Sequence, residues 1–294
     1  MNPPHLEIRE LAAWGLDRQT DRGSLACEHL QDAACKAQRK LGVRKPHQAE
    51  SPVSVEETRN LSSALTARSE AIAASGEFDG LASEPAIVDL RKLIAFQRRI
   101  GFAADGYSPI ERFPIEQRAT WQQLVDLALP MARIQPSNAI STTPDGTTLT
   151  VRTLSPNLTI RFAHGMDGSF GSIRLLAHSG SPYIEVASYH GRWFLRDGYH
   201  RSFLLLKHGI CHVPAVVVYA ETFAEVGAIG NQFFAKEILF SERPPMVTDF
   251  LDEEIAVRYL RPQRERVVQV FIRELQEQEL QEPVQTGCYE QEGL

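Results

Sequence analysis

The strongest constraint on the fold is the stretch RWFLRDGYHRSFLLLKHGICHVPAVVVYA, which spans residues 192–220. An apolar run ends at Asp197-Gly198, where the glycine permits a sharp change of backbone direction. Residues 199–208 then have helical apolar spacing, and a continuous apolar run follows Pro214. The stretch therefore predicts a strand, a tight turn, a helix and a buried strand in succession.

The first turn of the predicted helix contains Tyr199, His200 and Arg201. The start of a helix has free N–H groups and a partial positive charge, so it is suited to bind an anion. Arg201 could hold a phosphate with its forked guanidinium, and His200 could add a second donor. A plainer interpretation makes Asp197 the N-cap of the helix, with His200 and Arg201 on a solvated face. Helix chemistry alone leaves both interpretations open.

Gly198-Tyr199-His200-Arg201, set between two predicted strands, resembles the glycine-x-histidine-arginine motif of the ParB/sulfiredoxin-like superfamily, in the version found in sulfiredoxins and free serine kinases. The resemblance extends over residues 183–219, and IVDLRKLIAF at 87–96 is more distantly similar to the opening of the family domain. It implies an α+β fold, namely a ParB/sulfiredoxin-like mixed sheet with flanking helices. It also implies a bound nucleotide (CTP, ATP or ADP) with magnesium.

The resemblance assigns roles to six consecutive residues. It implies catalytic roles for Asp197 and His200, with Asp197 orienting magnesium or the substrate. Phosphate or nucleotide contacts are implied for Gly198, Tyr199, His200, Arg201 and Ser202. The site as a whole is therefore expected to bind a nucleotide or a phosphorylated small molecule.

Two departures from the family narrow the expected activity. Sulfiredoxins have their reactive cysteine at the position of Tyr199, so redox repair is not expected here. Partition proteins continue into a helix-turn-helix domain, and the sequence after Ala220 has no such pair of helices. The remaining expectation is an NTPase or a phosphotransferase, the latter acting on a small hydroxyl acceptor. The alternative is a non-catalytic module that senses nucleotide or binds a protein partner.

A phosphotransferase of this superfamily needs a carboxylate that takes the proton from the acceptor hydroxyl. Glu185 and Asp89 lie near the ends of predicted strands, and Glu111 and Glu116 are further candidates. No motif selects one of these four, and each is also an ordinary surface charge. The sequence therefore leaves the base unassigned.

Composition limits the class of partner. The 294 residues are 43% hydrophobic and 23% charged, as in ordinary globular proteins, and the net charge of −6 makes DNA an unexpected partner. No apolar run reaches the roughly 18 residues that span a bilayer, and the N-terminus lacks a signal core. Four dispersed cysteines without a CxxC pair favour the reducing cytoplasm.

Three regions are expected along the chain. Residues 1–82 are poor in aromatic residues and predict a helical or partly disordered N-terminal arm. Residues 83–220 predict the ParB/sulfiredoxin-like core. Residues 221–294 predict a helical and strand-containing extension with an acidic tail, and both termini are available to protein partners.

Within these regions, local patterns predict individual elements. Apolar spacing predicts helices over residues 91–100, 115–134 and 221–241. The pairs Asp145-Gly146 and His190-Gly191 predict the turns of two hairpins. The core is therefore expected to alternate helices with short strands.

Three other features have weaker functional interpretations. The glycine-rich stretch at 164–174 predicts a hairpin loop rather than a phosphate loop, because no lysine follows it. His208 and His212 are four residues apart, but Gly209 interrupts the helix that would align them on a metal. The arginine-rich segment 258–268 is surrounded by acids and predicts a solvated surface with ion pairs.

Overall fold

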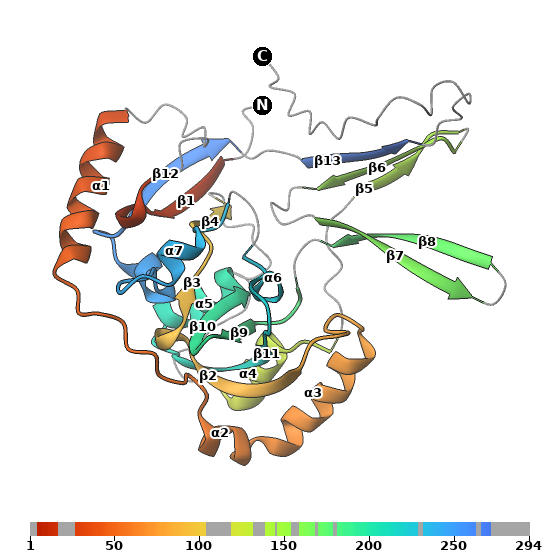
Figure 1. The fold of residues 1–294 in the computed structure, drawn as a ribbon, viewed down its shortest axis with the longest axis horizontal. Coiled ribbons are helices and arrows are strands. Elements are labelled where there is room, and N and C mark those ends of the chain that lie inside the picture. Colours follow the sequence, from red (N-terminus) through yellow and green to blue (C-terminus); the bar gives the residue numbers. More distant parts are fainter. Residues whose placement is uncertain are drawn as a thin grey trace. The chain divides into compact units, whose positions relative to one another are not determined.

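The computed structural model describes residues 5–16, 27–103, 119–131, 139–144, 146–153, 159–167, 170–178, 181–228, 232–262 and 266–271. The chain divides into two compact units (Figure 1): the first comprises Met1–Gln135 with His178–Arg264, and the second comprises Pro136–Ala177 with Glu265–Leu294. The boundaries between these units differ from the expected domain boundaries, which followed residues 82 and 220. Segments before residue 83 and after residue 220 belong to the same unit as most of the expected core.

A five-stranded mixed sheet forms the centre of the first unit. Its strand order is β2-β11-β9-β10-β3. The pairs β11/β9 and β10/β3 are parallel, whereas β2/β11 and β9/β10 are antiparallel. The bounds are β2 Ser83–Asp89, β3 Ile94–Ala95, β9 Glu185–Tyr189, β10 Arg192–Asp197 and β11 His212–Tyr219. Together with the helices below, this sheet makes the fold α+β.

The predicted strand–turn–helix–strand succession is confirmed. Strands β9 and β10 form a hairpin whose turn residues, His190 and Gly191, have φ values of 49° and 73°, as a two-residue turn of type I′ requires. Helix α5 (Tyr199–Lys207) follows β10, and β11 then lies between β2 and β9. Residues 213–218 of β11 are buried, which explains their continuous apolar sequence.

Helix α4 (Trp121–Ala128) packs against β11. It begins with a capping box in which the Thr120 side chain and Gln123 exchange hydrogen bonds with each other's backbone N–H groups. The predicted helix over 115–134 is confirmed in this part, and it ends before Pro130. Residues 115–118 and 132–134 lie outside the described residues.

The prediction of a helix over residues 91–100 is wrong. The segment forms a short 3-10 helix, η2 (Leu90–Lys92), then β3 and the strand β4 (Arg99–Ala103). Residues 93–96 are consecutive and each is at most 2% exposed. A surface helix turns part of any four consecutive residues toward water, whereas an extended segment covered on both faces does not.

A second sheet in the first unit has the order β12-β1-β4 and is antiparallel. It joins segments that are far apart in the sequence, because β1 (His5–Leu11) pairs with β12 (Ala256–Pro262) on one side and with β4 on the other. The N-terminal region therefore contains a central strand in addition to the predicted helices. Those helices are α1 (Cys27–Gly42), α2 (Val55–Asn60) and α3 (Ser62–Ala74), with the 3-10 helix η1 (Ala12–Trp14) after β1.

The long helix predicted over residues 221–241 is replaced by two short ones. Helix α6 (Phe223–Val226) ends at Gly227, whose φ of 87° is left-handed, and α7 (Lys236–Leu239) follows. Residues 229–231 lie outside the described residues. The 3-10 helix η3 (Val247–Leu251) then leads toward β12 and packs against α5.

The second unit contains the sheet β13-β6-β5 and the two-stranded sheet β7-β8. Their bounds are β5 Ala139–Thr142, β6 Thr148–Thr153, β7 Thr159–Asp167, β8 Phe170–His178 and β13 Arg266–Phe271. Strands β5 and β6 are antiparallel neighbours, as the predicted turn requires, although Asp145 itself lies outside the described residues. The glycine-rich stretch 164–174 falls on β7 and β8, with residues 168 and 169 outside the described part.

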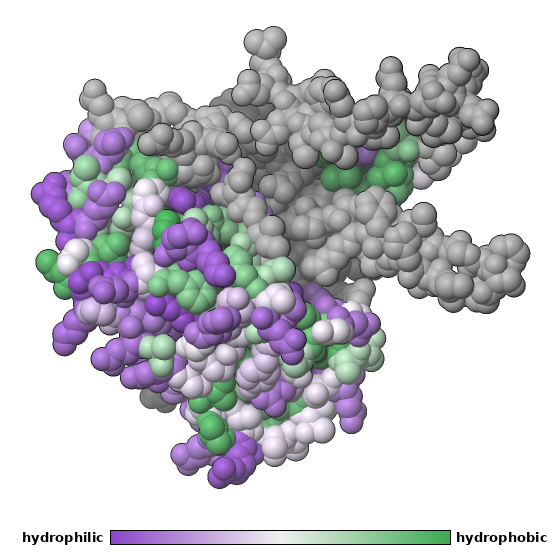
Figure 2. Space-filling model, in the orientation of Figure 1, coloured by the Kyte–Doolittle hydropathy of each residue, from purple (hydrophilic) through white to green (hydrophobic). Residues whose placement is uncertain are grey.

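The visible surface of the first unit is mixed in its hydropathy, with hydrophilic and hydrophobic residues interspersed (Figure 2). Among the described residues, no helix combines the length and the apolar character needed to cross a bilayer.

Candidate functional site

Gly198 joins β10 to α5, and its place in the fold requires a glycine. It is the N-cap residue of α5 and has a left-handed φ of 88°. A Cβ atom added there would lie 2.9 Å from Ile184 Cγ1 and 3.0 Å from Ile184 Cα. The glycine therefore permits both the sharp turn and the close contact with the chain that enters β9. This contact explains the residue without a ligand.

Asp197 closes the loop that precedes β9. Its Oδ2 accepts the N–H of Ser181 at 2.8 Å, and its Oδ1 accepts the N–H of Gly198 at 2.5 Å. The carboxylate thus holds the backbone on either side of the hairpin, and Gly198 rather than Asp197 is the N-cap residue. Capping of Tyr199 or His200 by Asp197, the plainer sequence interpretation, does not occur.

The guanidinium of Arg201 is directed into the protein. The residue is 6% exposed, and its Nη1 donates to the carbonyls of Leu127 at 3.2 Å and of Pro182. Its Nη2 donates to the carbonyls of Tyr183 at 2.7 Å and Ser181 at 3.5 Å. Burial lowers the pKa of Arg201, while Asp197 and Glu185 act in the opposite direction. The side chain therefore joins α4, the loop before β9 and α5, and its Nη donors are already engaged.

The Tyr199 side chain is also buried and hydrogen-bonded to other segments of the fold. It is 4% exposed, and its hydroxyl donates to the Leu195 carbonyl at 2.8 Å. The same oxygen accepts the N–H groups of Phe96 at 2.9 Å and Gln97 at 3.2 Å. Burial raises the pKa of Tyr199 well above its ordinary value. A neutral phenol in this environment connects β10 to the segment after β3, and it is not a nucleophile.

His200 is half-buried beside β4. Its Nε2 lies 2.7 Å from the Gly101 carbonyl oxygen, and its ring meets Phe102 edge to face at 5.3 Å. Because a carbonyl only accepts, Nε2 carries the proton in this contact.

Ser202 is fully buried within the first turn of α5. Its Oγ makes no hydrogen bond to any described residue. Most buried hydroxyls in proteins have a partner, so an unpaired one calls for an explanation. Of the six residues predicted for the site, it is the only one whose side-chain polar atom lacks an assigned partner in the described part of the chain.

Glu185 is brought to this region by a β-bulge. The pairing of β9 with β10 shifts between Leu195 and Asp197, so Arg196 and Asp197 together oppose Glu185. Glu185 is 4% exposed, and its Oε2 lies 3.1 Å from Arg196 Nη1. Burial raises the pKa of Glu185 to about 7, with Arg196 opposing and Asp197 and Glu77 adding to the rise. A carboxylate with such a pKa can exchange a proton near neutrality.

The other candidate bases are not brought to the start of α5. Asp89 lies on β2, which β11 and β9 separate from β10, and it pairs in register with His212 at the start of β11. Burial acts to raise its pKa, but Arg91, with Nη2 at 2.8 Å from Asp89 Oδ2, keeps that pKa below its ordinary value. Glu111 and Glu116 lie outside the described residues. Arg196, which sequence reasoning did not single out, pairs with Glu185, and its side chain also lies beside Gly227 at the end of α6.

No group of three or more His, Cys, Asp or Glu residues in the described ranges could hold a metal ion. Cys211 is a half-buried free thiol. The arginine-rich surface behaves as expected where it is described, since Arg258 Nη2 lies 2.9 Å from Glu253 Oε1.

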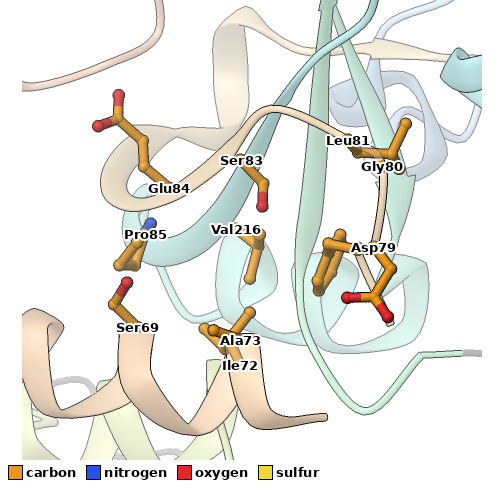
Figure 3. Close-up of a pocket in the computed structure, with 11 residues that line it drawn as sticks. Ser69, Ile72, Ala73, Asp79, Gly80, Leu81, Ser83, Glu84, Pro85 and Val216 are labelled. Atoms are coloured by element: carbon orange, nitrogen blue, oxygen red, sulfur yellow. The ribbon is translucent and has the colours of Figure 1, made fainter. Parts of the chain in front are cut away.

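A cavity of about 250 Å³ lies elsewhere, between α3 and the beginning of β2 (Figure 3). Ser69 and Ser83 contribute hydroxyls to its wall, and Val216 of β11 forms part of its floor. Glu84 lines it as well, but its Oε1 accepts a hydrogen bond from the Tyr219 hydroxyl at 2.6 Å. The lining residues, all within the described part of the chain, include no histidine, cysteine, lysine or arginine.

Comparison with known proteins adds no relative to this geometry. No family model, curated protein or solved structure matches the chain. The chemistry of the candidate site is therefore argued from its own residues.

Proposed function

We propose that the start of α5 binds the phosphate groups of a nucleotide or phosphorylated small molecule, as the resemblance to the ParB/sulfiredoxin-like superfamily implies. One observation carries the proposal. The N-cap residue Gly198 has no side chain to cap the helix, and residues 199–202, all described, include no acid. The free N–H groups and the partial positive charge of this helix end are therefore not neutralised by its own first turn.

Helices α4 and α6 of the same unit differ at this point, whereas α3 also begins without a side-chain cap or an acid in its first turn. Helix α4 is capped by Thr120, and α6 by Thr222, whose side chain accepts the N–H of Glu225. A second and independent observation is the Oγ of Ser202, in the first turn of α5, which has no hydrogen-bond partner among the described residues. A phosphate oxygen would satisfy donors of the kind that α5 presents.

The guanidinium that we assign to the phosphate is Arg196 rather than Arg201. All four contacts of Arg201 are to backbone carbonyls, and a phosphate would have to replace them. Arg196 is half-buried, its Nη1 pairs with Glu185, and its charge also acts on Glu225. Its remaining donors suit forked binding of an anion.

If the site is catalytic, phosphoryl transfer to a small hydroxyl acceptor is the class that fits. Such reactions depend on positioning and on stabilisation of charge, with a carboxylate that accepts the hydroxyl proton. Glu185 is the carboxylate that we assign to this role. The described residues do not fit a magnesium cage, because Asp197 already accepts two N–H groups. Magnesium is therefore a variable of the experiment and no step of the chemistry depends on it.

The second candidate function is non-catalytic nucleotide sensing or protein interaction within the same fold. It is favoured by the way Asp197, Tyr199 and Arg201 all use their polar atoms to hold backbone segments together. Turnover separates the two candidates. Release of phosphate from a nucleotide, lost in Glu185→Gln, supports the enzyme, and binding without turnover supports the sensor.

Thermal unfolding with CTP, ATP, ADP and GTP, each with and without magnesium, tests binding itself. A ligand at 100 times its Kd stabilises the folded state by about 2.7 kcal/mol. Arg196→Gln is expected to reduce this stabilisation, and Arg258→Gln, which removes the same charge from an exposed pair, is the control. Absence of a shift with every nucleotide would overturn the proposal.

A change of charge at the helix start tests the position of the site. His200→Glu places a carboxylate in the first turn, where it neutralises the helix end and repels phosphate. The stabilisation by nucleotide is expected to disappear in this variant. His200→Gln, which is neutral and similar in size, is expected to weaken binding far less. Equal effects of the two substitutions would place the phosphates elsewhere.

A further inference from the structure

Three aromatic rings from separate segments of the first unit form a cluster that we call the aromatic triad. Tyr189 ends β9, Phe223 begins α6 and Phe240 follows α7. The ring centroids are 6.1 Å apart for Tyr189 and Phe223, 6.0 Å for Tyr189 and Phe240, and 6.4 Å for Phe223 and Phe240. The rings are inclined to one another by 51°, 88° and 63°. They therefore form three differently oriented walls rather than a parallel stack.

The ammonium of Lys236 lies over all three walls. Its Nζ is 5.8 Å from the Tyr189 centroid, 5.2 Å from the Phe223 centroid and 5.9 Å from the Phe240 centroid. Ring faces attract cations electrostatically within about 6 Å. The triad thus already holds a positive charge at a point shared by three rings.

Lys236 is held there by the rings alone. It is exposed, and it makes no hydrogen bond or ion pair to any described residue. Arg192 provides the contrast, because its guanidinium lies 5.3 Å from the Phe240 centroid. It also donates to the carbonyls of Leu239, Phe240 and Ser241. Arg192 is a fixed part of the structure, whereas Lys236 can move into water at small cost.

The Nζ of Lys236 is farther from the ring centroids than atoms in direct contact are from one another. Atoms in close contact are about 3.5 to 4.0 Å apart, so a nitrogen 5.2 to 5.9 Å from the centroids lies well above the ring faces. A methyl group extends a nitrogen by about 1.5 Å, the length of a single C–N bond. A trimethylammonium group at the same point would therefore bring its methyl carbons near contact with several rings at once.

We propose that the aromatic triad is a binding site for a quaternary ammonium group, and that Lys236 occupies it until such a ligand displaces the side chain. The ligand class is a small molecule with a trimethylammonium head. Binding combines attraction of the cation to three ring faces with burial of its methyl groups. The site shares no residue with the start of α5, so this proposal does not depend on phosphate binding.

The test measures binding of choline to the full chain by calorimetry. The neutral probe 3,3-dimethyl-1-butanol, which has the same shape but no charge, is measured beside it. Choline is expected to bind at least about tenfold more tightly than the neutral probe, since charge attraction adds to equal apolar burial. Equal binding of the two probes would overturn the proposal, because it would indicate an apolar depression only.

Substitutions then locate the site. Lys236→Gln removes the resident cation and is expected to tighten choline binding about 3- to 10-fold. Phe223→Leu removes one wall and is expected to weaken binding by about 3- to 30-fold. Phe233→Leu, the same change at another half-buried ring, is the control and should leave binding as it was. Circular dichroism verifies that each variant is folded.

Lys236→Gln alone is decisive if a ring variant does not fold, because Lys236 is exposed. Folded Lys236→Gln that does not bind choline, or binds it no more tightly than the original chain, overturns the proposal. Loss of binding in Phe233→Leu together with Phe223→Leu would also overturn it, since the ligand would then lie outside the triad.

Discussion

The start of α5 and the aromatic triad differ in how their polar groups are used. At the start of α5, Arg201 and Tyr199 are buried, and their polar atoms hold backbone segments from other parts of the chain. At the triad, Lys236 is exposed, and among the described residues its ammonium contacts the faces of rings alone. The side chains of a conspicuous motif can thus serve the fold, while residues that no motif connects can gather around one exposed cation.

The largest expected effect tests whether Arg201 is structural. Arg201→Ala leaves the buried carbonyls of Leu127, Pro182 and Tyr183 without donors and removes a compensating charge beside two carboxylates. The free energy of unfolding in urea should fall by about 3 to 5 kcal/mol. Arg258→Ala, at a more exposed pair, should change it by about 0.5 kcal/mol or less. If Arg201→Ala lowered the free energy of unfolding only slightly, Arg201 would again be a candidate phosphate ligand.

A pH titration tests the buried carboxylate beside the motif. The pKa of Glu185 is raised to about 7, so the folded protein binds this proton more tightly than the unfolded chain does. The resulting stability is fully present below the ordinary pKa of a glutamate and is lost as pH rises to about 7. The loss should be on the order of 3 kcal/mol, and Glu185→Gln should remove it. Parallel pH profiles for the two proteins would contradict the burial of a titrating carboxyl.

Two glycine substitutions separate backbone strain from packing. Gly198 and Gly209 have left-handed φ values of 88° and 76°, but only at Gly198 would a Cβ meet a neighbour, Ile184. Gly209→Ala should therefore lower stability by about 1 kcal/mol. Gly198→Ala should lower it by about 2 to 4 kcal/mol, because overpacking adds to the strain. Equal losses, measured by urea denaturation, would mean that the close contact at Gly198 contributes nothing.

The smallest expected effect concerns the triad. Lys236→Gln loses an exposed cation–π contact, so the free energy of unfolding should fall by only about 0.5 kcal/mol. Arg192→Gln loses contacts to three carbonyls at the end of α7 and should cost about 1 to 3 kcal/mol. Similar losses in the two variants would show that Lys236 is as firmly held as Arg192, and would count against its displacement by a ligand.

The sequence by itself determined the elements that depend on local pattern. The type I′ turn at His190-Gly191, the helix from Tyr199, the buried strand after Pro214 and the helix at Trp121 all follow from periodicity and turn chemistry over a few residues. These signals are local, because backbone conformation and apolar spacing are set by neighbouring residues. The same local reasoning was wrong for residues 91–100, where burial on both faces overrides helical spacing.

Only the tertiary structure decided what the side chains of the motif do. Arg201 meets carbonyls from residues 127 and 181–183, and Tyr199 meets the N–H groups of residues 96 and 97, all distant in sequence. The bulge that adds Arg196 to Glu185 and Asp197 depends on the register of two strands. The aromatic triad likewise joins three segments. Hydrogen-bond partners, burial and pKa are properties of the surroundings in space, and a sequence pattern records only surroundings along the chain.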